Sequence, residues 1–147
     1  MNFTNTITIN RPPAEVFAYL AEFENVPRWN YAISETSKTT AGPVRVGSRY
    51  RQTRTIPTRT EETFEVTEFE PGRALSIRGT LGPFYGDLTY VLTLSGSGTA
   101  LTNTANVRAT GPLRSIAALA ASRVRSAVAA NLNTLTQILE ADGRRDG

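Results

Sequence analysis

Residues 111–140, GPLRSIAALAASRVRSAVAANLNTLTQILE, are the most informative part of this 147-residue chain for its fold. At 3.6 residues per turn, its apolar residues fall on one stripe of a helix and most of its polar residues fall outside that stripe. The first two-thirds of the stripe are mostly alanine and valine, so this face is narrow. The pattern predicts a long C-terminal helix with open space in front of it; the alternative is that the alanines let the helix backbone approach a sheet closely. The stripe consists of Leu113, Ile116, Ala117, Ala120, Val124, Ala127, Val128, Leu132, Leu135, Ile138 and Leu139, with the polar Asn131 near its centre.

The residues before this helix are typical of strands joined by short turns. Residues 3–9 alternate between apolar and polar side chains, which predicts a first strand. Pro12-Pro13 then begins a short helix, because proline suits the first helical turn, and a second short helix or turn covers residues 24–30. From residue 32 onward, runs rich in Val, Ile, Thr, Tyr and Phe alternate with turn signals. Such short turns can join only antiparallel strands. The turn signals are AGP 41–43, IPT 56–58, PG 71–72, LGP 81–83 and SGSG 95–98.

Residue alternation also predicts the register of two hairpins. A two-residue turn at Gly96-Ser97 places the apolar sides of its two strands opposite each other, with the pairs Leu92–Leu101, Tyr90–Asn103 and Leu88–Ala105. An earlier three-residue turn at 57–59 gives the pairs Tyr50–Val66, Gln52–Phe64 and Arg54–Glu62, with Arg51 opposite Glu65 on the outer face. The segment 80–86, which holds two glycines and a proline, is a candidate for a flexible entrance.

The composition excludes several kinds of chemistry. The chain has no cysteine and no histidine, so it can build neither a disulfide, nor a Ser–His–Asp triad, nor a metal site from these two residue types. The formal net charge is +3, but the arginines are scattered and no nucleic-acid motif accompanies them. The N-terminus lacks the blocks of a signal peptide, and arginines interrupt the alanine-rich helix. We therefore expect a cytoplasmic protein, monomer or homodimer, without metal, cofactor, nucleic-acid partner or integral membrane association. Residues 1–142 are expected to form a single domain, and residues 143–147 a frayed tail.

Five motifs, taken in order, carry a resemblance to a known family. They are INRPPAEVF (9–17), VPRWN (26–30), VGSRY (46–50), FEPGRAL (69–75) and NLNTL (131–135). Together they span nearly the whole chain, which resembles the START/birch-pollen-allergen-like (SRPBCC) superfamily and, more narrowly, its bacterial polyketide cyclase/dehydrase-like members. The resemblance implies an α+β helix-grip fold: a curved seven-stranded antiparallel sheet wrapped around a long C-terminal helix, with two short helices after the first strand. It also implies a hydrophobic ligand between sheet and helix. Some relatives use a histidine acid or base, which this chain lacks.

Inward-facing positions supply the candidate site residues. Tyr90, Asn103 and Asn131 either satisfy one another's hydrogen bonds in the core or bind a ligand's carbonyl or hydroxyl group. Arg54 and Glu62 form either a surface ion pair near the open end of the hairpin or a reactive pair. Trp29 either packs the short-helix segment against the sheet or stacks on a ligand. The full set of ligand-binding candidates is Tyr50, Gln52, Arg54, Glu62, Phe64, Tyr90, Asn103, Ala120, Val124 and Asn131.

Three functions are compatible with these residues. The first is binding of a small hydrophobic or aromatic molecule, such as a lipid, a quinone or a polyketide-like compound. The alternative is a polyketide cyclase, aromatase or dehydratase that positions its substrate and relays protons without histidine, through Glu62, Arg54, Tyr90 or Asn103. The third is a protein-interaction module, which would need an exposed apolar patch. It ranks last, because the outward positions are mostly Thr, Arg and Glu.

Overall fold

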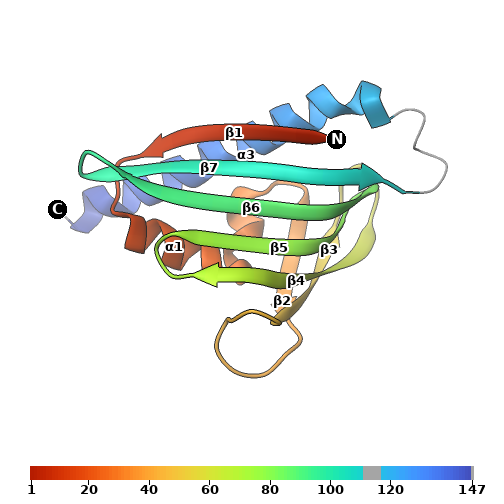
Figure 1. Ribbon diagram of the computed structural model, residues 1–147, viewed down its shortest axis with the longest axis horizontal. Coiled ribbons are helices and arrows are strands. Elements are labelled where there is room, and N and C mark those ends of the chain that lie inside the picture. The colour runs from red at the N-terminus through yellow and green to blue at the C-terminus, as the bar shows by residue number, and fades with distance from the viewer. Residues whose placement is uncertain (111–116, 147) are drawn as a thin grey trace.

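The computed structural model describes the backbone of residues 1–110 and 117–146, and the side chains of residues 1–110 and 122–143. A strand, two short helices and a 3-10 turn are followed by six more strands and one long helix (Figure 1). The elements are β1 (Asn2–Ile9), α1 (Pro13–Ala21), η1 (Phe23–Asn25), α2 (Val26–Trp29), β2 (Ile33–Lys38), β3 (Arg49–Arg54), β4 (Thr60–Glu70), β5 (Ala74–Leu81), β6 (Phe84–Ser95), β7 (Gly98–Ala109) and α3 (Ala117–Asp146).

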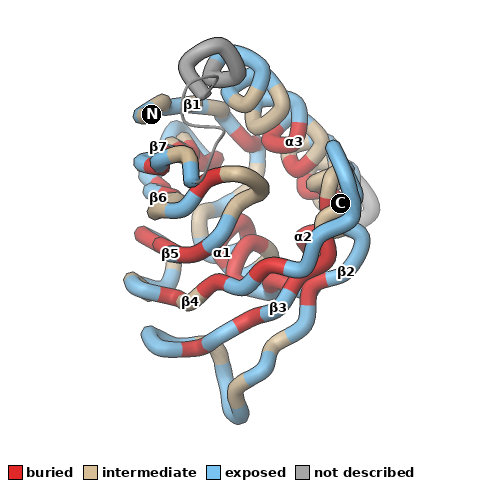
Figure 2. The backbone as a smooth tube through the Cα atoms, turned by 90° about the vertical axis from the view of Figure 1, so that its right-hand side faces the viewer, coloured by how far each residue is buried: buried red, intermediate tan, exposed pale blue. Residues whose placement is uncertain are grey.

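The strands form one antiparallel seven-stranded sheet in the order β1-β7-β6-β5-β4-β3-β2. The sheet curves, and the helices lie on its concave side (Figures 1 and 2). The predicted helix-grip architecture is therefore confirmed. The β6–β7 register is also as predicted: Leu92 faces Leu101, Tyr90 faces Asn103 and Leu88 faces Ala105.

The predicted register of the β3–β4 hairpin is wrong by two residues. Tyr50 faces Phe64, Gln52 faces Glu62 and Arg54 faces Thr60. The connection is longer than expected, because β3 ends at Arg54 and β4 begins at Thr60. An even shift leaves every side chain on its predicted face, so alternation alone cannot detect it.

The same shift corrects the outer face of this hairpin. Arg51 faces Thr63 instead of Glu65. Glu65 instead lies opposite Arg49, whose Nε is 3.5 Å from its Oε1. An opposite-charge pair therefore exists on the outer face, but with a different arginine.

The core is deepest where α1 and the second half of α3 meet the sheet. Val16, Phe17 and Leu20 of α1 are buried, and so are Leu132 and Leu135 of α3. In contrast, Val124, Ala127 and Val128 in the first half of α3 are only partly buried. The C-terminal half of α3 thus anchors the helix, while its earlier part faces open space.

The C-terminal end of α3 lies beyond the predicted one. The expected start of the helix, with Leu113 and Ile116, lies outside the described residues, as do the side chains of Ala117 and Ala120. At the other end the helix continues to Asp146, beyond the expected domain boundary at residue 142.

Candidate functional site

A cavity of about 550 Å³ lies between the concave face of the sheet, the first half of α3 and the segment around α2. It is in the size range of small-molecule sites, which hold roughly 300–1,000 Å³. Aromatic and aliphatic side chains form most of its wall. These include Phe23, Trp29, Phe64, Ile77, Phe84, Leu88, Ala105 and Val107, with Val124, Ala127 and Val128 from α3.

Among the described residues, polar side chains interrupt this apolar wall at seven positions: Asn30, Tyr31, Gln52, Arg54, Tyr90, Arg123 and Asn131. Gln52 and Arg54 come from β3, Tyr90 from β6, and Asn131 from α3. Burial raises the pKa of Tyr90, so its phenol stays protonated at neutral pH and can donate a hydrogen bond. No carboxylate is among the described residues that line the cavity. The wall is therefore suited to a largely apolar molecule that carries oxygen acceptors.

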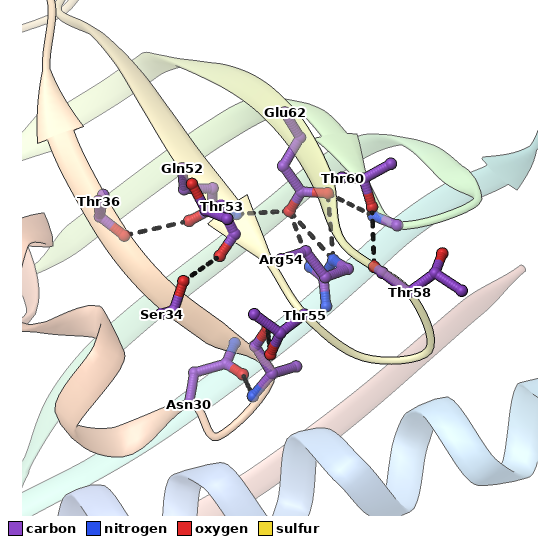
Figure 3. Close-up of polar contacts among 12 residues, drawn as sticks. Asn30, Ser34, Thr36, Gln52, Thr53, Arg54, Thr55, Thr58, Thr60 and Glu62 are labelled. Carbon is purple, nitrogen blue, oxygen red and sulfur yellow. Dashed lines mark hydrogen bonds and ion pairs between the residues drawn. The ribbon is translucent and has the colours of Figure 1, made fainter.

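The Arg54 guanidinium is held in place by Glu62 (Figure 3). Arg54 donates from Nη2 to Oε1 of Glu62 at 2.8 Å and from Nε to Oε2 at 3.1 Å. The same carboxylate accepts hydrogen bonds from Gln52 Nε2 at 2.6 Å and from the backbone N–H of Gly82 at 2.9 Å. The Glu62 side chain is only 1% exposed, so the pair is not the exposed surface pair that one sequence interpretation proposed. The carboxylate ties β3 and β4 to the β5–β6 turn.

The structure brings together only part of the predicted residue set. Tyr50, Glu62 and Asn103 lie behind the cavity wall, and the side chain of Ala120 lies outside the described residues. No hydrogen bond joins the three described side chains Tyr90, Asn103 and Asn131. The predicted residues that do line the cavity are Gln52, Arg54, Phe64, Tyr90, Val124 and Asn131.

Two of the residues behind the wall carry buried polar atoms without a partner. The Tyr50 ring stacks on Phe64 at 5.0 Å between ring centroids, and its hydroxyl has no hydrogen-bond partner. Burial raises the pKa of Tyr50 to about 12, with a smaller contribution from the charge of Glu24. Asn103 donates to the Thr89 carbonyl at 3.4 Å, but its Oδ1 is unpaired. These two side chains do not line the cavity; they pack behind the residues that do.

Sequence reasoning missed the residues around the cavity opening. Ile56 and Pro57 of the β3–β4 loop, Pro83 of the β5–β6 turn, and Arg123 of α3 all line the cavity. Alternation within strands gives no information about loop residues, so only the Gly and Pro content of segment 80–86 pointed to this region. Trp29 is 7% exposed and also lines the cavity, so packing and ligand contact are compatible for this residue.

The described residues contain no group of three or more Asp, Glu, His or Cys side chains arranged to hold a metal ion. Within the described ranges, no helix combines the length and the hydrophobicity needed to cross a bilayer.

Comparison with known proteins gives a family and a set of similar folds. The family described as polyketide cyclase / dehydrase and lipid transport matches residues 1–140. No curated protein matches the sequence significantly. The Zhui aromatase/cyclase from Streptomyces sp. R1128 is 17% identical, with a TM-score of 0.78 over 100% of this chain and 98% of that one. A conserved protein from Geobacillus kaustophilus is 14% identical, with a TM-score of 0.79 over 96% of each chain. Ara h 8.0201 is 12% identical, with a TM-score of 0.75 over 96% of this chain and 98% of that one.

Proposed function

Because the chain belongs to the polyketide cyclase/dehydrase and lipid transport family, we propose that it binds a small hydrophobic or aromatic molecule in the cavity between the sheet and α3. The observation that carries this proposal is the cavity of about 550 Å³, whose wall is mostly aromatic and aliphatic. Burying apolar ligand surface there contributes about 25 cal/mol per Å² before the costs of binding. Tyr90, Asn131 and Arg54 offer hydrogen-bond donors that orient a carbonyl or hydroxyl group. Lipids, quinones and polyketide-like aromatics all have this combination.

The single tryptophan provides a direct readout of this proposal. Trp29 lines the cavity, so a bound aromatic molecule or quinone would change its fluorescence. We expect saturable quenching of Trp29 emission during titration with a panel of quinones and polycyclic aromatics, and one-to-one complexes in native mass spectrometry. A panel in which no member produces either signal would contradict the proposal.

Filling the cavity from α3 should abolish this binding. Ala127 lines the cavity and Ala129 is exposed on the same helix. We expect Ala127→Phe to weaken binding at least tenfold, because the ring occupies ligand space, whereas Ala129→Phe should bind like the wild type. Both variants should be checked for folding by circular dichroism before titration. Equal affinity in the two variants would place the ligand elsewhere.

A second candidate function is cyclisation or dehydration of a polyketide-like substrate. It is favoured by the placement of Arg54 and the protonated Tyr90 in one apolar wall. Both groups could donate to an enolate oxygen as negative charge develops there, and Glu62 keeps the guanidinium oriented. Removing one such donor typically costs a factor of about 10²–10³ in rate.

This candidate is tested with a synthetic poly-β-ketone thioester, following the absorbance of the cyclised aromatic product. We expect turnover by the wild type and a loss of about a hundredfold in Tyr90→Phe. Glu62→Gln should also slow turnover, because it weakens the orientation of Arg54. Absence of product with the wild type would remove the enzymatic candidate and leave the binding function standing. Full activity in both variants would show that these side chains do not carry the reaction.

The remaining proposals concern the location, the oligomeric state and the partners of the protein. We propose a cytoplasmic location, a monomer or homodimer, and no nucleic-acid partner. The absence of clustered basic residues supports the last of these.

A further inference from the structure

Arg123 lines both the cavity and an adjoining groove between α3 and Tyr31. This groove has a volume of about 390 Å³ and shares Tyr31, Arg123 and Ala127 with the cavity. Tyr31 is 60% exposed and follows α2, which contacts α3. The remaining residues of the groove are Ser122, Ser126 and Ala130. A ligand in the cavity can therefore extend one end into the groove beside Arg123.

The polar groups of the groove are all hydrogen-bond donors or hydroxyls. Ser126 is four positions after Ser122 and three after Arg123, so its side chain neighbours both along the helix surface. With the Tyr31 hydroxyl and the Arg123 guanidinium, they offer several donors and one positive charge. No carboxylate is among the described residues that line either the groove or the cavity. The local chemistry therefore favours an anion.

Arg123 differs from the other arginine of the cavity wall in its charge balance. Arg54 is neutralised by the buried carboxylate of Glu62. Arg123 is exposed, and within the described part of the chain it forms no ion pair or hydrogen bond. It is thus the uncompensated positive charge of the cavity opening.

We propose that the groove at Arg123 binds the anionic group of an amphiphilic ligand whose apolar body fills the cavity. The anion is a carboxylate, sulfonate or phosphate, and the donors of the groove face its oxygens. This subsite rests on the proposed binding function. It adds that the natural ligand is an acid, bound with its charged end outward.

The test uses two fluorescent probes that differ by a single sulfonate group. N-phenyl-1-naphthylamine is neutral, and 1-anilinonaphthalene-8-sulfonate has the same ring system with an anionic group. We expect Arg123→Gln to weaken sulfonate binding about fivefold, as for a solvent-accessible charge pair, and to leave the neutral probe unchanged. In the wild type, added salt should weaken the sulfonate probe selectively, because salt screens exposed charges.

Arg125→Gln is the matched control for the loss of one positive charge. Arg125 is exposed on the same helix, donates to the Thr4 carbonyl at 3.4 Å, and lines neither the cavity nor the groove. Its replacement should leave the affinity of both probes unchanged. If Arg123→Gln and Arg125→Gln have equal effects, or if Arg123→Gln affects both probes equally, the subsite is overturned while binding in the cavity stands. If neither probe binds the wild type, the proposed function and the subsite both fall.

Discussion

Replacing Glu62 with alanine is expected to lower the free energy of unfolding by about 3–5 kcal/mol, because it leaves a largely buried arginine without its counter-charge. The Arg54 side chain is only 16% exposed, so solvent cannot fully replace the lost carboxylate. Gln52 Nε2 and the N–H of Gly82 lose their acceptor at the same time. Urea denaturation followed by circular dichroism measures the loss. The released β5–β6 turn should also exchange its amide hydrogens faster, starting with Gly82.

Two variants separate the buried pair from a general effect of charge. Glu61 is the neighbouring exposed residue, whose Oε1 accepts from the Thr53 hydroxyl at 2.8 Å. Glu61→Ala should cost about 1 kcal/mol. The double variant Arg54→Met/Glu62→Met should regain much of the lost stability, since apolar replacement of both partners removes the isolated charge. If Glu62→Ala were no less stable than Glu61→Ala, the buried network would not support the fold.

Adding a methyl group to Gly86 is expected to cost about 3 kcal/mol of stability, because the neighbouring strand already occupies that position. A Cβ at Gly86 would overlap the Asn106 carbonyl oxygen and lie 2.8 Å from the Val107 Cα. Gly79, which lies opposite in β5, is similarly restricted: its Cβ would lie 2.7 Å from the Cα of Phe64. Alternation places both glycines on the concave face, together with Ile77 and Leu88. The two glycines thus allow the neighbouring strands to approach closely where the sheet lines the cavity.

Thermal unfolding of Gly86→Ala and Gly79→Ala measures this cost. The control is Gly96→Ala in the β6–β7 turn, where φ is +61° but no atom lies within 4 Å of an added Cβ. That variant should lose only about 1 kcal/mol, from the unfavourable backbone conformation. If all three variants lost similar stability, close contact between strands would not explain the two inward glycines. A Gly86→Ala variant that folds normally should also show a changed affinity for cavity ligands.

Most of the fold was predictable from local patterns, and the candidate site only partly. Strand alternation gave the correct β6–β7 register, because a two-residue turn leaves no freedom in the pairing. It placed Tyr50, Gln52 and Phe64 on the inner face even though the β3–β4 register was two residues off. Arg54 and Glu62 were expected to form a pair, and they do. They are diagonal neighbours on adjacent strands, however, and not direct cross-strand partners.

The cavity opening could not be predicted in the same way. Ile56, Pro83 and Arg123 come from two loops and a helix that are distant in sequence, and none of their positions follows from a strand period. The glycines of segment 80–86 suggested a flexible entrance. In the structure, the Gly82 N–H donates to the Glu62 carboxylate, and Gly86 accommodates the close approach of β7.

The order of elements, the inward set of side chains and the narrow face of the terminal helix all follow from the amino-acid sequence. These features follow from the periods of two residues in a strand and 3.6 residues in a helix, which can be recognised within a short stretch of sequence. Which inward residues line the cavity, and which pack behind those residues, is set by the three-dimensional packing. That distinction depends on how tightly the sheet curves and on how far α3 stands from it. Glu62, Tyr50 and Asn103 therefore lie behind the wall, whereas Arg54, Tyr90 and Asn131 face the space where a ligand would lie.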